Sequence, residues 1–312
     1  MRFAKGHGTG NDFVILPDPD DRLDLTASLA ARMCDRRTGL GADGILRVVR
    51  ARPASDAHVR QAGLRQDGLW QDGGDQPVEW FMDYRNADGG IAEMCGNGIR
   101  VFARYLLDND LATGPEIAVA TRSGVRKVRE VREVRDAGTG TAAAPGELIA
   151  ELGPARVTGK GCARMGQRAC DGLAISVGNP HLACLTDSPV AEFDLSVPPV
   201  LGEGQFPDGA NVEVLRVTGP RHIEMRVYER GSGVTLSCGT GAVAAAVAAA
   251  VAAGEWLAGP EQPWIVDVPG GRLTVTPSAT ASLLAGPAVI VATGELDDAW
   301  IRSARDSRSP VG

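Results

Sequence analysis

The stretch Met94-Cys95-Gly96-Asn97-Gly98 and its near copy Ser237-Cys238-Gly239-Thr240-Gly241 decide the fold of this chain. Each consists of a cysteine, a Gly-X-Gly turn and a following segment with helical character. A cysteine just ahead of a helix lies where unpaired backbone N–H groups and the helix dipole favour negative charge, so its thiolate is stabilised. Two such cysteines are suited to act as a matched acid and base.

Both halves of the chain place their elements in the same order. A strand, a polar loop and a second strand open each half, at residues 2–16 and again at residues 173–185. A strand ending in Tyr84 or Tyr228 then leads through glycine-rich turns to the cysteine. This order predicts a duplicated α/β unit, with equivalent features of the two lobes brought to the cleft between them.

The lobe boundary is expected near the strand at residues 148–152. The last strands, including residues 288–292, are expected to return to the first lobe. The first lobe then comprises residues 1–150 and 286–312 and carries Cys95, and the second comprises residues 151–285 and carries Cys238. Residues 51–77 predict a long surface hairpin, and residues 136–145 a hairpin tip or linker.

Composition restricts the class of protein. The 312 residues are 44% hydrophobic and 23% charged, which is typical of a globular protein. A net charge of −7 argues against nucleic-acid binding, which needs a basic surface. The N-terminus has no apolar stretch suited to a signal peptide, and the tract from Ala242 to Ala253 is too short to cross a bilayer. We therefore expect a cytoplasmic protein without membrane contact, whose six cysteines are thiols.

Other chemistries fit the sequence less well. Four residues separate Cys95 from Arg100, where a cysteine phosphatase loop would need five. The match of residues 239–244 to a dinucleotide fingerprint lacks the acidic residue about 20 positions later. No Walker motif, His-Glu-x-x-His or Cys-x-x-Cys indicates a phosphate or metal site. None of the three lysines lies in a pyridoxal phosphate context. No metal or cofactor is therefore expected.

Polar residues at strand–loop junctions are the candidates for substrate binding. A single asparagine in such a place is usually a turn residue. Four in matching contexts of both halves indicate a polar cage around a ligand. They are Asn11, Asn86, Asn179 and Asn211. His181 and the pair Glu229-Arg230 are further candidates. A capped turn and a surface ion pair are the alternative interpretations, but the position of Glu229-Arg230 just before the second cysteine motif favours a role in the site.

The chain resembles the diaminopimelate epimerase family over nearly its whole length. The motifs that carry the resemblance are Gly10-Asn11-Asp12-Phe13, Asn86-Ala87-Asp88-Gly89, Cys95-Gly96-Asn97-Gly98, Gly178-Asn179-Pro180-His181, Tyr228-Glu229-Arg230-Gly231 and Cys238-Gly239-Thr240-Gly241. The resemblance implies two pseudo-symmetric lobes, each a mixed β-sheet wrapped around a central helix. It also implies a homodimer and a cofactor-independent interconversion of LL- and meso-diaminopimelate, on the route to lysine and peptidoglycan.

The resemblance also implies a role for each candidate residue. Cys95 and Cys238 would flank the α-carbon as thiolate and thiol, because inversion without a cofactor needs a base on one face and an acid on the other. His181 and Glu229 would support this pair. The α-carboxylate would be held by N–H groups of Gly96-Asn97 and Gly239-Thr240. The remaining substrate contacts would come from Asn11, Asn86, Asn179, Asn211, Glu229 and Arg230.

One position departs from the family pattern, and two other functions stay open. Gly44 stands where many members have glutamine, so one side-chain contact to the substrate is absent or replaced. A proline or hydroxyproline racemase of the same fold is the first alternative, and it would not need the distal set Asn179, Asn211 and Arg230. A thiol redox sensor, in which Cys95 and Cys238 form a reversible disulfide, is an alternative of another class.

Overall fold

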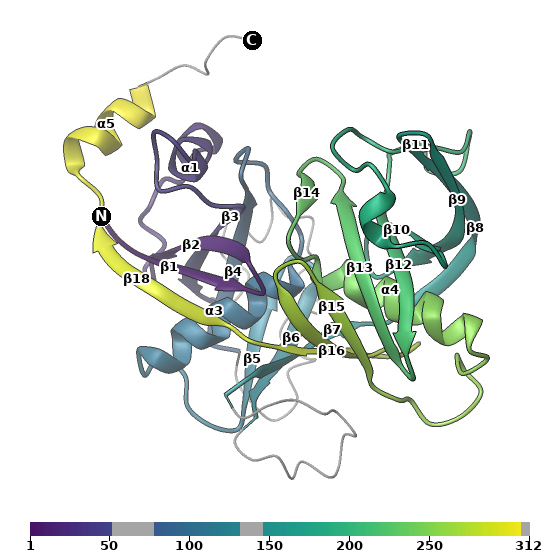
Figure 1. Cartoon of the computed structure of the whole chain (residues 1–312). Helices are drawn as coiled ribbons and strands as arrows, with labels where there is room; N and C mark the ends of the chain where they lie inside the picture. The colour runs from purple at the N-terminus through teal and green to yellow at the C-terminus, as the bar shows by residue number, and fades with distance from the viewer. Residues whose placement is uncertain (52–77, 132–145, 307–312) are drawn as a thin grey trace. The chain divides into compact units, whose positions relative to one another are not determined.

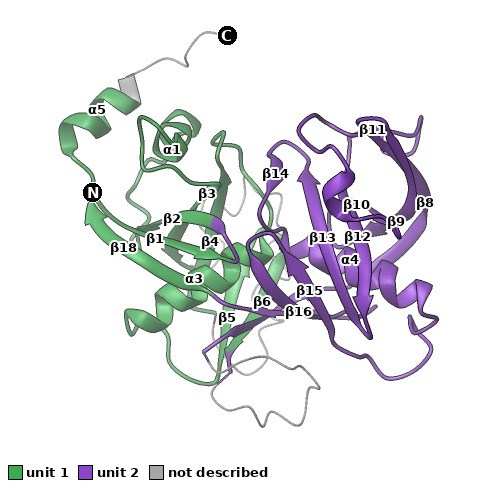
Figure 2. Cartoon of the chain, viewed as in Figure 1, with its two compact units in different colours: residues 1–8, 12–129, 288–312 green, residues 9–11, 130–287 purple. Residues whose placement is uncertain are grey.

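The computed structural model of the chain describes residues 1–51, 78–131 and 146–306, which form two compact units. Unit 1 contains residues 1–8, 12–129 and 288–312, and unit 2 contains residues 9–11 and 130–287 (Figure 2). Residues 52–77 of the expected hairpin and the expected linker at 136–145 lie outside the described part of the chain. The C-terminal strand returns to unit 1, as the sequence predicted.

The described residues of unit 1 form seven strands and three helices, most of which are labelled in Figure 1. Its described elements are β1 (Arg2–Gly8), β2 (Asn11–Pro17), α1 (Ala27–Cys34), β3 (Gly44–Arg50), β4 (Trp80–Asn86), α3 (Gly96–Asp108), β5 (Glu116–Thr121), β6 (Gly124–Glu130), β18 (Val289–Glu295) and α5 (Asp298–Asp306). Thr26 caps α1 as predicted, since its side chain accepts a hydrogen bond from the backbone N–H of Leu29.

Unit 2 is larger and richer in strands. Its elements are β7 (Leu148–Gly153), β8 (Arg156–Met165), β9 (Arg168–Ser176), β10 (Pro180–Leu185), η1 (Val190–Glu192), β11 (Val200–Leu201), β12 (Asn211–Gly219), β13 (His222–Glu229), β14 (Gly233–Thr235), α4 (Gly239–Ala252), β15 (Trp264–Val268), β16 (Gly271–Thr276) and β17 (Ser282–Gly286). Strand β7, at the lobe boundary that the sequence predicted, pairs with β17 and lies in unit 2.

The two units repeat one pattern of strand pairing. In unit 1, β2 and β3 are parallel, β3 and β4 antiparallel, β4 and β5 parallel, and β5 and β6 antiparallel. In unit 2, the same succession runs through β10, β12, β13, β15 and β16. In each unit the helix after the cysteine connects the second parallel pair, as α3 or as α4. The predicted duplication and the mixed α+β fold class are therefore confirmed.

The helix of each repeat is the centre of its core. Gly239 to Ala250 of α4 are all buried, and α4 contacts strands on several sides, including β10, β12 and β16. A helix of alanine and valine is apolar all round and so is suited to complete enclosure by a sheet. Helix α3 packs on β1, β18, β3 and β4 and buries one broad face that includes Ile99 and Phe102.

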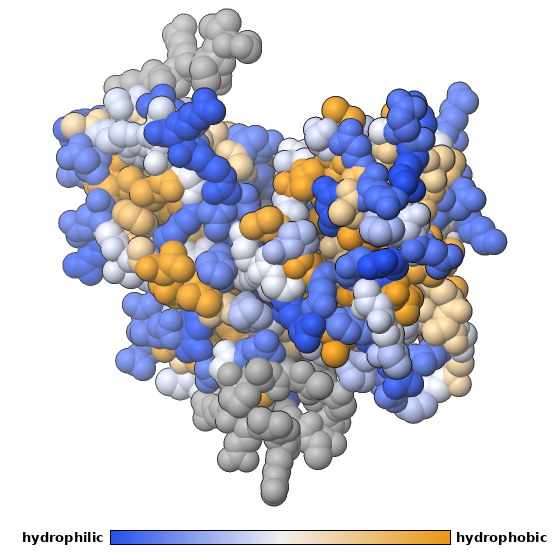
Figure 3. Space-filling model, in the orientation of Figure 1, coloured by the Kyte–Doolittle hydropathy of each residue, from blue (hydrophilic) through white to orange (hydrophobic). Residues whose placement is uncertain are grey.

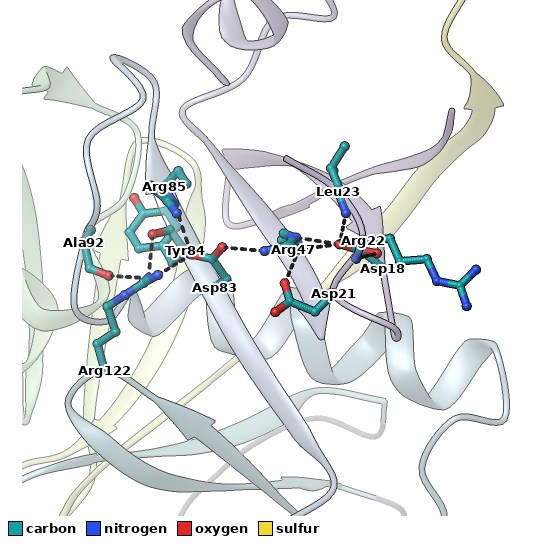
Figure 4. Close-up of polar contacts among 10 residues, drawn as sticks. All are labelled: Asp18, Asp21, Arg22, Leu23, Arg47, Asp83, Tyr84, Arg85, Ala92 and Arg122. Carbon is teal, nitrogen blue, oxygen red and sulfur yellow. Dashed lines mark hydrogen bonds and ion pairs between the residues drawn. The ribbon is translucent and has the colours of Figure 1, made fainter. Parts of the chain in front are cut away.

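A network of buried ion pairs crosses the sheet of unit 1 (Figure 4). Arg47 of β3 and Asp83 of β4 are cross-strand partners, and both side chains are 1% exposed. Arg47 also pairs with Asp18, and Asp83 pairs with Arg122. Burial opposes ionisation of Asp83, but the charge of Arg122 and further arginine contacts hold its pKa below the usual value. Removing one partner from such a network leaves a buried charge without compensation.

The surface is mixed. Figure 3 shows hydrophobic patches separated by hydrophilic side chains on the face that it presents. On β18, the side chains of Val289 and Val291 are 42% and 56% exposed. Within the described residues, none of the helices combines the length and the apolar character that crossing a membrane requires.

Candidate active site

Cys95 and Cys238 occupy the same place in the two units, at the N-cap of the central helix. Both have extended backbone, with φ and ψ of −137° and 121° at Cys95 and −122° and 119° at Cys238. The sulfur of Cys95 accepts the backbone N–H of Gly98 at 3.3 Å, and the sulfur of Cys238 accepts that of Gly241 at 3.4 Å. Each thiol therefore lies at the positive end of a helix dipole, as the sequence predicted.

The second glycine of each motif leaves room for the cysteine. A Cβ on Gly98 would lie 3.1 Å from Cβ of Cys95. A Cβ on Gly241 would lie 3.2 Å from Cβ of Cys238 and 2.7 Å from Oε1 of Glu213. The Cys-Gly-X-Gly pattern is thus a packing requirement of a cysteine N-cap, and the requirement is stricter in unit 2.

In unit 1, the predicted residues gather around the start of α3. Asn97 is fully buried, and its Oδ1 accepts a hydrogen bond from Arg100 at 3.0 Å. Asn86 ends β4 and is the cross-strand partner of Gly44. A Cβ on Gly44 would lie 2.6 Å from the carbonyl oxygen of Arg85 and 2.7 Å from the ring of Tyr84. The backbone at this position therefore has no space for the glutamine that the family pattern places there.

Asn11 belongs to unit 2, although the sequence assigned it to the first lobe. The segment 9–11 packs on the loop that precedes Cys238, where Thr9 Oγ1 donates to Ser237 Oγ at 2.8 Å. A Cβ on Gly270 would lie 1.7 Å from the Thr9 carbonyl oxygen, which shows how closely the backbones approach. Asn11 is buried, with 6% of its surface exposed. Such a contact between segments distant in sequence has no local signature.

Asn211 and Arg230 form a second group in unit 2. Oδ1 of Asn211 accepts the backbone N–H of Arg230 at 2.9 Å, and its Nδ2 donates to the carbonyl of Pro180 at 3.3 Å. Nη1 of Arg230 donates to the carbonyl of Asp208 at 2.9 Å. Asn211 thereby joins the start of β10 to the end of β13, and the Asp208 contact orients the Arg230 guanidinium.

Cys238 lies among buried acidic groups. It is 5% exposed, and burial raises its pKa well above the usual value, with further upward contributions from the charges of Glu229 and Glu213. Burial also raises the pKa of Glu229, whose carboxyl group accepts a hydrogen bond from Thr235 and contacts Cys238. The surroundings of Cys238 therefore favour its neutral thiol.

His181 is fully buried, and its partner Glu213 was not recognised in the sequence. Nδ1 of His181 lies 2.7 Å from Oε1 of Glu213, and Nε2 lies 2.9 Å from Oδ1 of Asn179. Glu213 is also fully buried, and burial raises its pKa against the lowering effect of His181. The only signal in the sequence was an acidic residue inside the apolar strand Asn211 to Leu215.

The structure thus places the predicted site residues in two groups. Unit 1 holds Asn86, Cys95, Gly96 and Asn97, and unit 2 holds Asn11, Asn179, His181, Asn211, Glu229, Arg230, Cys238, Gly239 and Thr240. Each group contains one N-cap cysteine and the first N–H groups of a helix, and a helix N-terminus favours negative charge.

Comparisons with known proteins show the family of the chain. The family model described as "Diaminopimelate epimerase" matches residues 3–145 and 173–296. The diaminopimelate epimerase of Thermobifida fusca is 51% identical over 95% of this chain and 98% of its own. That of Mycolicibacterium smegmatis is 49% identical over 96% of this chain and 98% of its own.

Solved structures share the fold at low identity. A phenazine biosynthesis protein of the PhzF family from Bacillus anthracis has a TM-score of 0.64 at 14% identity and covers 95% of this chain and 98% of its own. A hydroxyproline epimerase from Agrobacterium vitis has a TM-score of 0.59 at 14% identity, covering 99% of this chain and 98% of its own. From the family model and the relatives near 50% identity, the chain belongs to the diaminopimelate epimerase family.

Proposed function

We propose that this protein interconverts LL- and meso-2,6-diaminopimelate by proton transfer at the α-carbon, with no cofactor. The observation that carries the proposal is the pair of cysteine N-caps with the same backbone conformation and the same sulfur contact, in a chain about half identical to diaminopimelate epimerases.

Two thiols are suited to this chemistry. In the proposed mechanism, Cys95 and Cys238 act on opposite faces of the α-carbon. One sulfur removes the α-proton as a thiolate, and the other delivers a proton as a thiol. The roles exchange in the reverse reaction, so the two protons titrate as properties of the pair.

The helix N-termini would stabilise the charge that develops. The α-carboxylate is proposed to bind the backbone N–H groups of Gly96-Asn97 and Gly239-Thr240. As the α-proton leaves, negative charge spreads onto this carboxylate, and preorganised N–H donors stabilise it more than they stabilise the ground state.

The acidic surroundings of Cys238 support an assignment of the resting state. Burial raises the pKa of Cys238, and the charges of Glu229 and Glu213 raise it further, so we propose that Cys238 rests as the thiol. Cys95 then supplies the thiolate in the absence of substrate. His181 and Glu229 support Cys238 from within unit 2.

The polar residues would hold the rest of the substrate. Asn11, Asn86, Asn179, Asn211 and Glu229 are proposed to bind its amino and carboxyl groups. Arg230 would bind the distal carboxylate, because a guanidinium suits bidentate recognition of carboxylate. Proline has no second amino-acid head, and the solved hydroxyproline epimerase, at 14% identity, shows only that the fold is shared.

We also propose a cytoplasmic homodimer. The family resemblance supports both features, and the exposed valines of β18 offer apolar surface to a second copy. Sedimentation equilibrium of the purified protein tests this, since a mass of 32.5 kDa would show a monomer.

The function is tested by incubating the purified protein with LL-diaminopimelate and, separately, with L-proline, without added cofactor. We expect meso-diaminopimelate to form and L-proline to stay unchanged, as measured by chiral chromatography. Inversion of proline without conversion of diaminopimelate would reject the proposal.

A further inference from the structure

We propose that Glu213 is a positioning residue, which holds His181 as an imidazolium and thereby orders a chain of hydrogen bonds that ends on the sulfur of Cys238. The inference deepens the proposed function and rests on it, because it concerns the thiol assigned there as acid and base. All members of the chain lie in unit 2, which places them independently of unit 1.

The proposal places a proton on each ring nitrogen of His181, on the basis of the two atoms that these nitrogens face. Nδ1 lies 2.7 Å from Oε1 of Glu213, and Nε2 lies 2.9 Å from Oδ1 of Asn179. With Glu213 as a carboxylate and the amide oxygen of Asn179 toward the ring, both partners accept, so in the proposed chain both ring nitrogens donate. Oε2 of Glu213 is buried and makes no hydrogen bond within the described residues, so His181 supplies the compensating charge.

The orientation of the Asn179 amide determines the direction of the next hydrogen bond, which is the one to Thr240. Because its Oδ1 faces His181, its Nδ2 faces Thr240 and donates to Oγ1 at 3.4 Å. The hydroxyl of Thr240 then accepts this bond and has its own proton free for Cys238, whose sulfur lies 3.6 Å away. Every donor between His181 and Cys238 consequently points toward the sulfur.

A neutral His181 would reverse the chain. Its unprotonated Nε2 would accept from the amide of Asn179, which would rotate and turn its oxygen to Thr240. The Thr240 hydroxyl would then donate to Asn179 and no longer to Cys238. The ion pair of Glu213 and His181 therefore decides whether the sulfur receives a donor that stabilises its thiolate.

The proposed chain and a simple charge effect predict opposite effects of Glu213→Gln on the stability of the Cys238 thiolate. A negative charge near Cys238 raises the pKa of the thiol, so removing it should favour the thiolate. In the proposed chain, His181 becomes neutral in Glu213→Gln. The net charge of the pair is then zero in the variant, as it is in the wild type, where the carboxylate and the imidazolium balance each other. The thiolate then loses the Thr240 donor and becomes less stable.

Three measurements on the whole protein test the chain. The first is the ¹⁵N NMR spectrum of the His181 ring, assigned with His181→Gln. The second is the rate at which iodoacetamide alkylates Cys238, followed by peptide mass spectrometry. The third is kcat and KM with LL-diaminopimelate. The matched control is Asp267→Asn, because His222 and Asp267 form a second pair at 2.7 Å on the surface of unit 2.

We expect both ring nitrogens of His181 to be protonated in the wild type and only one in Glu213→Gln. Alkylation of Cys238 should slow by about tenfold, the equivalent of losing one hydrogen bond to a charged group. We expect kcat to fall by about tenfold as well, because the thiolate loses the same hydrogen bond, with KM little changed. Asp267→Asn should change none of these values.

A second pair of variants keeps the test decisive if Glu213→Gln does not fold. Thr240→Ser keeps the hydroxyl, so its Cys238 should be alkylated at the wild-type rate. In Thr240→Val, Cys238 should be alkylated as slowly as in Glu213→Gln. A neutral His181 in the wild type, or equal or faster alkylation in Glu213→Gln or Thr240→Val, would overturn the proposal. If the wild type does not epimerise diaminopimelate, the proposed function fails. The NMR spectrum of the His181 ring and the alkylation rates of Cys238 still test the hydrogen-bond chain in that case.

Discussion

The carboxylate of Glu213 and the imidazole of His181 meet at 2.7 Å inside unit 2, with neither side chain exposed. They come from parallel strands β12 and β10, in which Asn211 is the register partner of His181. The same pairing thus fixes the histidine, its acidic partner and one proposed substrate ligand. A shift of register would disturb all three together, which ties the fold of the repeat to its chemistry.

Alanine at the second glycine of each motif should affect the two units unequally. Gly241→Ala brings a Cβ to 2.7 Å from Glu213 Oε1, whereas Gly98→Ala meets Cys95 and Leu46 at 3.1 Å and 3.2 Å. Overpacking costs about 1–3 kcal/mol, which exceeds the gain of roughly 1 kcal/mol from alanine in a helix. We expect Gly241→Ala to lower kcat and stability more than Gly98→Ala, measured by kinetics and urea unfolding. The control is Gly159→Ala, which meets nothing within 4 Å; equal effects in the two motif variants would contradict this account.

Restoring the glutamine of other family members at Gly44 should harm the protein. The new Cβ would lie 2.6 Å from the Arg85 carbonyl oxygen and 2.7 Å from the Tyr84 ring, so β3 and β4 would have to separate. We expect Gly44→Gln to lower the free energy of unfolding by about 1–3 kcal/mol and to raise KM for diaminopimelate. A variant with wild-type stability and a lower KM would show that the strands adapt.

Asp83 should be far more important for stability than a surface carboxylate. Asp83→Ala leaves the buried Arg122 without its carboxylate partner and removes one of the carboxylates that pair with Arg47, which costs about 3–5 kcal/mol. Glu79→Ala breaks a pair with Arg50 whose side chains are about half exposed and should cost less than about 1 kcal/mol. Urea unfolding of both variants measures the difference, and similar losses would mean that the network is not needed.

Stability should fall in acid partly through Asp12. Lys5 and Arg36 outweigh burial and lower the pKa of Asp12 from 3.8 to about 2. A carboxyl whose pKa is lower in the folded state contributes stability above its unfolded pKa and loses it as pH falls through the folded pKa. The contribution is on the order of 2 kcal/mol and should vanish between about pH 4 and pH 2.

The variant Asp12→Asn should therefore be less stable at pH 6 and show a flatter fall in stability below pH 4. Asp108→Asn is the control, since its surface pair with Arg104 contributes about 0.5 kcal/mol or less. If Asp12→Asn retained the wild-type slope in acid, the lowered pKa would not be the cause.

The sequence predicted the elements that depend on local chemistry. The Thr26 cap, the two helices after the cysteines and the return of residues 288–292 are all present in the structure. These predictions rest on capping residues, apolar runs and a repeat, which short windows of sequence contain.

The remaining features depend on strand register over long distances. The pairing of Arg47 with Asp83 follows from the β3–β4 register, although a charge inside each apolar strand was a usable signal. The contact of Glu213 with His181 needs the β10–β12 register, and Thr9 meets Ser237 across more than two hundred residues. Local pattern does not specify such pairings, because they depend on how the whole sheet closes.

The most direct test of the two-thiol mechanism is proton exchange at the α-carbon in D₂O. The purified protein is incubated with LL-diaminopimelate without cofactor, and NMR follows the α-proton signals. In a two-base mechanism the arriving proton comes from a different group than the departing one, so the meso product should carry deuterium at the inverted centre. Cys95→Ala and Cys238→Ala should each abolish inversion. Deuterium-free meso product, or substantial inversion by either cysteine variant, would contradict the account.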